Sequence, residues 1–275
     1  MPRKVVKFTS WRCKMKTRIF VISPDSGINS EELIFKILGH GFNGTVKETC
    51  FGAMVEGEEK EVEKIVDFIR REYYHEVFTK DRGYPIGDKR ICRAERGGGA
   101  RSGLYQIEYE AGFLPFISQA LRDFEIFKVK NPKKIIVHPI NSLILADLVE
   151  RAGHYPVTMM EKIGNLVRNP EIDSPPRNIT TEDVVRGLKY ASVEMPSGIR
   201  GRLGVWDSLI EQAEAALIAN YDYAFGCAGC THNDILIYLI KARKIPYLRL
   251  NLPRNYEEGK EFVKKIFEFL KNVGD

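Results

Sequence analysis

The sequence has no apolar run long enough to cross a membrane. Its longest apolar stretches, such as residues 142–146 and 235–240, fall far short of the roughly 18 uninterrupted residues that a membrane helix needs. The first eighteen residues contain seven lysines and arginines, no acid and no apolar h-region, which is unlike a secretory signal. We therefore expect a cytoplasmic protein without a membrane partner.

Cysteine is scarce, with 5 in 275 residues. Without a secretory signal, so few cysteines do not indicate a disulfide framework, and a reducing cytoplasm is the natural compartment. The sequence also lacks a Ser-His-Asp order, a His-Glu-x-x-His helix and the Gly-Lys-Ser/Thr ending of a nucleotide-binding P-loop. Nucleotide hydrolysis and the common hydrolytic mechanisms are therefore poorly supported.

The composition is that of a folded protein, with 44% hydrophobic and 29% charged residues. A chain of 275 residues predicts one large domain or two small ones, and we favour two. The net charge of +5 is uneven, because residues 1–133 hold 24 Lys and Arg against 19 Asp and Glu, while the remainder is balanced. This excess fits an acidic partner or an anionic ligand as well as an ordinary solvated surface.

Residues 17–127 predict an α+β ferredoxin-like domain, preceded by a basic extension of residues 1–16. The predicted elements are a strand at 17–23, a helix capped at Asn29, short strands near 45–51 and 53–56, and an amphipathic helix at 59–73. This β-α-β-β-α order is most of a ferredoxin-like unit. A helix at 104–124, interrupted near Gly112, follows.

Residues 128–133 predict a linker, and residues 134–275 predict an α/β Rossmann-like domain with a mostly parallel sheet. The predicted strands are 135–138, 155–159, 222–225 and 246–250, and the predicted helices are 143–151, 231–242 and 256–272. Strands that alternate with helices indicate a parallel sheet covered on its faces. Residues 169–179, rich in Pro, Asn and Asp, predict a loop.

The most specific local motif is the pair Cys227 and Cys230 in a Cys-x-x-Cys spacing, after a predicted strand and before a helix. Ligands of open α/β sheets bind outside the carboxyl ends of strands, and a helix N-terminus favours thiolate. The pair suits thiol redox exchange or the binding of a soft metal. An iron–sulfur cluster, for example, needs four ligands. The missing ligands would come from Cys50, Cys92, His232 or a partner. A tight turn without chemistry is the alternative.

A basic glycine-rich segment, residues 80–103, contains Arg93, Arg96 and Arg101. Backbone amides and guanidinium groups suit oxyanions, so the segment predicts an anion cradle or a docking surface for an acidic protein. The alternative is a flexible loop without a binding role. Aromatic residues hardly interleave with these charges, which argues against nucleic acid as a partner.

The second half contains another candidate anion site, formed by Ser197, Arg200 and Arg202 ahead of a predicted helix. His138 lies at a strand-to-helix turn that we expect on the same sheet edge as Cys227. It is a candidate ligand or general base, or else a hydrogen-bonded histidine at a helix cap.

Longer motifs resemble two methanogenesis marker protein families. Residues 17–122 resemble family six through Ile22-Ser-Pro-Asp25, Val46-Lys-Glu-Thr-Cys-Phe-Gly-Ala53, Arg82-Gly-Tyr-Pro-Ile-Gly-Asp88 and Cys92-Arg-Ala-Glu-Arg-Gly-Gly-Gly99. Residues 134–272 resemble family five through the stretches that begin at His138, Glu171, Arg186 and Pro196, and through Phe225-Gly-Cys-Ala-Gly-Cys230. The chain therefore looks like a fusion of the two families.

This resemblance implies an archaeal accessory factor for methyl-coenzyme M reductase, an enzyme that works when the nickel of its cofactor F430 is reduced to Ni(I). The factor would serve assembly, maturation or reductive activation in a multiprotein complex rather than act as a stand-alone enzyme. Cys227 and Cys230 would hold a cluster or exchange electrons, and the arginines of residues 80–103 would dock a partner.

Two alternatives stay open. The first is an enzyme for a phosphorylated or carboxylated small molecule, with Ser197, Arg200 and Arg202 holding the anion and His138 as acid–base. The second is a purely structural scaffold. Whether the chain forms oligomers is also open.

Overall fold

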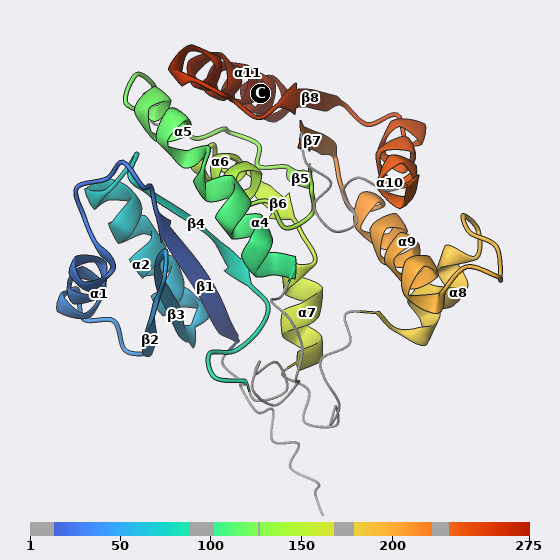
Figure 1. Ribbon diagram of the computed structural model, residues 1–275, viewed down its shortest axis with the longest axis horizontal. Coiled ribbons are helices and arrows are strands. Elements are labelled where there is room, and N and C mark those ends of the chain that lie inside the picture. The colour runs from blue at the N-terminus through green and yellow to red at the C-terminus, as the bar shows by residue number, and fades with distance from the viewer. Residues whose placement is uncertain (1–13, 89–101, 126, 168–178, 222–230) are drawn as a thin grey trace, which may run out of the picture.

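The computed structural model describes residues 14–88, 102–125, 127–167, 179–221 and 231–275, and these residues contain two four-stranded sheets (Figure 1). The first sheet is antiparallel throughout, and the second is parallel throughout. Helices α4 (Ser102–Ala111), α5 (Leu114–Leu121) and α6 (Leu143–Arg151) lie between the two sheets. The chain is thus an antiparallel α/β half followed by a parallel α/β half.

The antiparallel sheet has the order β2-β3-β1-β4. Its strands are β1 (Met15–Ile22), β2 (Thr45–Thr49), β3 (Gly52–Glu58) and β4 (Val77–Arg82). Side chains alternate along β1: Phe20 packs into the core under α1 (Ser30–Gly39) and α2 (Glu59–Glu72), whereas Ile19 and Val21 pack into the core between the sheets. Both faces of this sheet are therefore covered.

The two helices of this half begin and pack as their sequences predict. Asn29 caps α1 in a capping box, because its side chain accepts from the Glu32 backbone N–H at 2.9 Å while the Glu32 carboxylate accepts from Asn29 N. In α2 the apolar positions at helical spacing, Val62, Ile65, Val66 and Ile69, are the buried ones.

The parallel sheet has the order β6-β5-β7-β8. Its strands are β5 (Lys134–His138), β6 (Tyr155–Val157), β7 (Ala215–Asn220) and β8 (Tyr247–Asn251). One face packs on α5, α6 and α11 (Tyr256–Gly274), and the other packs on α9 (Ser197–Ile210) and α10 (Thr231–Ala242). The remaining described helices are α7 (Met160–Val167) and α8 (Thr181–Gly187). Within the described residues, no helix is long and apolar enough to cross a membrane.

The structure adds two strands that the sequence analysis did not predict. Strand β4 closes the antiparallel sheet, and β7 occupies residues 215–220, ahead of the strand predicted at 222–225, which lies outside the described residues. The interrupted helix is confirmed as α4 and α5, separated at Gly112 and Phe113. The boundary predicted at residues 128–133 stays a prediction. Helix α5, N-terminal to it, crosses α11 so closely that a Cβ on Gly259 would lie 2.5 Å from the Phe116 carbonyl oxygen.

Candidate functional site

Many of the predicted site residues lie outside the described residues. These are Cys92, Arg93, Arg96, Arg101, Cys227 and Cys230, together with the side chain of His232 in the first turn of α10. The predicted thiol site and the predicted arginine cradle therefore stay predictions.

Cys50 is the candidate cysteine that the structure does describe. It is a free, exposed residue in the turn between β2 and β3. Among the described residues, no group of three or more His, Cys, Asp or Glu side chains is arranged to hold a metal ion. Cys227 and Cys230 lie outside the described residues, so the iron–sulfur site stays a prediction.

The candidate anion residues of the second half lie in α9. Ser197 is its exposed first residue, and Arg200 donates from Nη1 to the Val193 carbonyl oxygen at 2.9 Å, which fixes the preceding turn. Helix α8 packs closely against this motif, since a Cβ on Gly187 of α8 would lie 1.9 Å from the Arg200 carbonyl oxygen. The motif thus has a packing role, and its predicted anion binding stays a prediction.

The parallel sheet itself indicates where a ligand would bind. From β5 the chain crosses to β6 on one side, and β7 then pairs with β5 on the other side. Such a reversal of strand order is a topological switch point, and open parallel sheets bind ligands outside the carboxyl ends of the two strands that flank it. Here those ends are His138 in β5 and Asn220 in β7.

His138 is buried at this point, with 3% of its surface exposed. Its ring centre lies 5.4 Å from that of Trp206 in α9. Four residues later Ser142 caps α6 by accepting the Leu145 N–H at 3.1 Å. The strand-to-helix turn that the sequence predicts is therefore present.

A buried carboxylate, Glu110 of α4, reaches the same turn. One of its oxygens accepts the Leu143 and Ile144 N–H groups at 2.6 and 3.0 Å, so it caps the start of α6 together with Ser142. The other accepts from Gln106 at 3.0 Å and from the Tyr221 hydroxyl. Burial, followed by the charge of Glu110, raises the pKa of Tyr221 well above its usual range.

Lys80 of β4 enters this cluster from the antiparallel half. It is 7% exposed, and its ammonium group donates to the Asn141 carbonyl oxygen. Burial lowers the pKa of Lys80 to about 8; the charge of Glu110 opposes this shift and that of Arg82 adds to it. The Asn141 side-chain oxygen is also buried, and no described residue donates to it. Together, Lys80, Glu110, Asn141 and Tyr221 form what we call the switch-point cluster.

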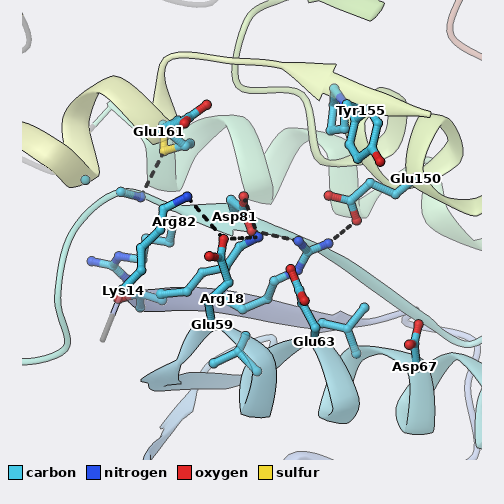
Figure 2. Close-up of a pocket in the computed structure, with 18 of the residues that line it drawn as sticks. Lys14, Arg18, Glu59, Glu63, Asp67, Asp81, Arg82, Glu150, Tyr155 and Glu161 are labelled. Atoms are coloured by element: carbon cyan, nitrogen blue, oxygen red, sulfur yellow. Dashed lines mark hydrogen bonds and ion pairs between the residues drawn. The ribbon is translucent and has the colours of Figure 1, made fainter. Parts of the chain in front are cut away.

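A large cleft opens at the C-terminal end of β4 (Figure 2). It encloses about 1250 Å³ between α2 and β1 on one wall and β6 and α7 on the other. Glu59, Glu63 and Asp67, four residues apart along α2, line one side, and Figure 2 shows Arg18 between Asp81 and Glu150. The cleft carries charges of both signs, and its most buried cation, Arg18, is already paired.

Beside this cleft, buried ion pairs join the two halves of the chain. Arg70 of α2 contacts Glu150 and Asp147 of α6 at 2.7 and 3.0 Å, and Arg18 of β1 also contacts Glu150. Arg151 of α6 donates back to the carbonyl oxygens of Tyr74 and Val77. Burial alone would raise the pKa of Glu150, but the charges and hydrogen bonds of Arg18 and Arg70 hold it well below its usual range.

Glu110 and Tyr221 were not predicted from the sequence, and Lys80 was predicted in the basic glycine-rich loop of residues 80–103 rather than in the strand β4 where it lies. A signal existed for Glu110, which lies among apolar residues of a predicted helix, at a position where a carboxylate needs a buried partner. Lys80 gave no such signal, because Lys80, Asp81 and Arg82 together resemble an exposed loop.

The fold and this cluster define an α/β protein whose parallel sheet carries a buried polar cluster at its switch point. The chain belongs to the family described as "Uncharacterized protein conserved in archaea (DUF2112)", whose model matches residues 133–273. A second model, "Uncharacterized protein conserved in archaea (DUF2102)", matches residues 19–122. The two matches correspond to the parallel and antiparallel halves.

Two relatives come from Methanocaldococcus jannaschii. The chain is 54% identical over 143 residues to "Uncharacterized protein MJ0404", and the matched region covers 51% of this chain and 95% of that protein. It is 36% identical over 148 residues to "Uncharacterized protein MJ0498", and the matched region covers 54% of this chain and 91% of that protein. Each relative is therefore too short to contain both family segments. No solved structure matches the chain.

Proposed function

We propose that this chain is a methanogenesis-associated accessory factor that serves the assembly, maturation or reductive activation of methyl-coenzyme M reductase in a cytoplasmic multiprotein complex. The proposal rests on the resemblance of residues 17–122 to marker family six and of residues 134–272 to marker family five. Its support is that both matching families are archaeal and that two relatives come from a methanogen.

The observation that carries the proposal is the joining of two family segments that the shorter relatives cannot both contain. A fusion holds its parts at high effective concentration. In this chain the parts are also bonded directly, through Arg70 with Glu150 and through Arg151 with the carbonyl oxygens of Tyr74 and Val77. We therefore infer that the two halves act as one unit.

We also infer the finer fold names. The antiparallel order β2-β3-β1-β4 with two helices on one face supports a ferredoxin-like first half, and the parallel order β6-β5-β7-β8 supports a Rossmann-like second half. These folds host many functions, so they support the proposal only by compatibility.

In this proposal Cys227 and Cys230 hold an iron–sulfur cluster or exchange electrons, with further ligands from Cys50, Cys92, His232 or a partner. Thiolate ligation suits low-potential electron transfer, since cluster potentials extend far below zero. The exposure of Cys50 supports its availability as a ligand. Arg93, Arg96 and Arg101 dock the acidic face of a partner.

The test is anaerobic purification of the full chain, with its complex, from its native host, followed by a visible spectrum and iron, zinc and sulfide analysis. We expect iron and sulfide that are lost in Cys227→Ser and kept in Cys13→Ser, a matched cysteine outside the motif. A colourless, metal-free protein that still co-purifies with reductase-associated proteins would favour a scaffold instead. A protein with no metal, no partners and no loss on Cys227→Ser would contradict the proposal.

A second candidate function is an enzyme for a phosphorylated or carboxylated small molecule. The observation that favours it is that His138 and two members of the switch-point cluster, Asn141 and Tyr221, lie where parallel sheets bind ligands. The convergence of Arg200 and His138 on one concave site would favour this candidate further. Neither residue lines the large cleft of Figure 2.

A further inference from the structure

We propose that Lys80 and Asn141 form a binding site for the oxyanion group of a small ligand, a carboxylate or a phosphate, at the switch point between β5 and β7. This inference concerns binding alone. It goes beyond the accessory role, so its failure would leave that role untouched, and it deepens the second candidate function by naming residues that hold the anion. It also makes the site composite, because Lys80 belongs to the antiparallel half and Asn141 to the parallel half.

Lys80 has unused hydrogen-bonding capacity. A lysine ammonium group has three N–H donors. In the described residues the group has one hydrogen-bond partner, the Asn141 carbonyl oxygen, although the side chain is almost fully buried. A buried charged donor without acceptors costs free energy, and native folds rarely keep one without a use.

No described acid pairs directly with the Lys80 ammonium group. The nearest acid, Glu110, does not hydrogen-bond to Lys80, because its two oxygens are taken by Leu143 N, Ile144 N, Gln106 and the Tyr221 hydroxyl. It acts on Lys80 at longer range, and Arg82 adds a second positive charge. The positive charge of Lys80 therefore remains available to an anionic ligand.

The Asn141 side chain limits which ligands fit. The Asn141 side-chain oxygen is a buried acceptor to which no described residue donates. A ligand that fills both vacancies accepts hydrogen bonds from Lys80 and donates one to Asn141. Hydroxy acids and hydrogen phosphate have this combination of an oxyanion and an O–H group.

The usual anion site at a switch point, the start of the following helix, is already occupied here. The first N–H groups of α6 would normally attract an anion at the switch point. Here Glu110 and Ser142 occupy those of Leu143, Ile144 and Leu145. The group that can still bind an anion here is the Lys80 ammonium group. The site therefore requires β4, which comes from the other half of the chain.

The test uses the full chain with two probes, inorganic phosphate and glycolate, each titrated against chloride at constant ionic strength. We expect one probe to raise the thermal midpoint by about 2–5 °C near saturation, because a ligand that binds the native state stabilises it. Calorimetric titration should give a dissociation constant at least ~10-fold weaker in Lys80→Met, since the charge-assisted bond is lost. The probe that binds identifies the source of the oxyanion.

Lys64→Met is the control, because Lys64 is an exposed lysine of α2 and should keep the full response. Asn141→Ala is the second variant. It leaves the backbone acceptor of Lys80 in place and should weaken binding by about 10-fold through the lost acceptor. If Lys80→Met does not fold, Asn141→Ala decides. Equal responses in the wild type and the variants, or no response of the folded wild type to either probe, would overturn the proposal.

Discussion

Arg70 and Glu150 lie 2.7 Å apart, nitrogen to oxygen, and this ion pair joins α2 of the antiparallel half to α6 of the parallel half. Arg18 shares the same carboxylate. A carboxylate that serves two buried guanidinium groups is hard to replace, since each cation would remain in a poorly solvated place. The contact between the two family segments therefore depends strongly on one residue.

We accordingly predict that Glu150→Gln lowers the free energy of unfolding by about 3 kcal/mol, because removing one member of a buried ion-pair group leaves the others uncompensated. Urea denaturation followed by circular dichroism measures it. Glu61→Gln is the matched control, since Glu61 forms an exposed pair with Lys64 in α2 and its loss should cost less than about 0.5 kcal/mol. Similar losses in both variants would contradict the structure.

The second prediction concerns Lys80 and alkaline pH. Its pKa in the folded protein is about 8, against 10.5 for an ordinary lysine. Between these values the unfolded chain binds more protons than the folded chain, so the contribution of Lys80 to stability rises with pH across this window. Below pH 8 the buried charge is a cost, and above pH 10.5 that cost is gone.

Lys80→Met should therefore be at least as stable as the wild type at pH 7, and the difference should shrink as the pH rises from 8 to 10.5. Urea denaturation at several pH values, in phosphate-free and carboxylate-free buffer, measures the difference. Subtracting the variant from the wild type cancels the titration of other lysines and tyrosines. A difference that stays constant over this window would show that Lys80 is not buried as a cation.

Much of the antiparallel half could be predicted from sequence because its signals are local. The Asn29 cap and the four buried apolar positions of α2 each follow from spacing within one element. The strand β4 could not be predicted, because Lys80 is buried by contacts with Asn141, 61 residues away, and no local pattern records such a contact.

The location of the candidate site could be predicted from the sequence, but most of the residues that form it could not. His138 and its strand-to-helix turn follow from the local sequence, as does the rule that ligands bind at the carboxyl ends of parallel strands. The neighbouring strand was missed because Ala215–Asn220 is rich in alanine, which favours helices, and its place between β5 and β8 overrides that propensity. Without β7, Tyr221 and its bond to Glu110 could not be foreseen.

The third prediction tests the packing of α8 on α9. Gly204→Ala should lower the free energy of unfolding by about 1–3 kcal/mol, because its Cβ would lie 1.9 Å from the Asp183 backbone oxygen and the helices would have to separate. Gly198→Ala in the same helix is the control. No atom lies within 4 Å of its Cβ position, so the higher helix propensity of alanine should leave stability unchanged or raise it. Equal effects would mean that the helices are not in contact at Gly204.

The fourth prediction tests Glu110 as the group that ties α4, α6 and the end of β7 together. Glu110→Leu should cost about 3 kcal/mol, because two N–H groups of α6 and the Tyr221 hydroxyl lose their buried acceptor. Urea denaturation gives the total. Amide exchange at Leu143 and Ile144 locates the effect, since both amides should exchange faster than in the wild type.

The matched control for this variant is Glu108→Leu, an exposed position two residues earlier in α4. It keeps the helix and makes the same chemical change without removing a buried acceptor, so it should alter stability by less than about 0.5 kcal/mol. Tyr221→Phe should fall between them, at about 1 kcal/mol, because it removes one donor and leaves the Glu110 cap of α6 intact. If Glu108→Leu and Glu110→Leu had the same effect on stability, the Glu110 carboxylate would not lie at the start of α6. Lys80 would then also lack the nearby anion that partly compensates its charge.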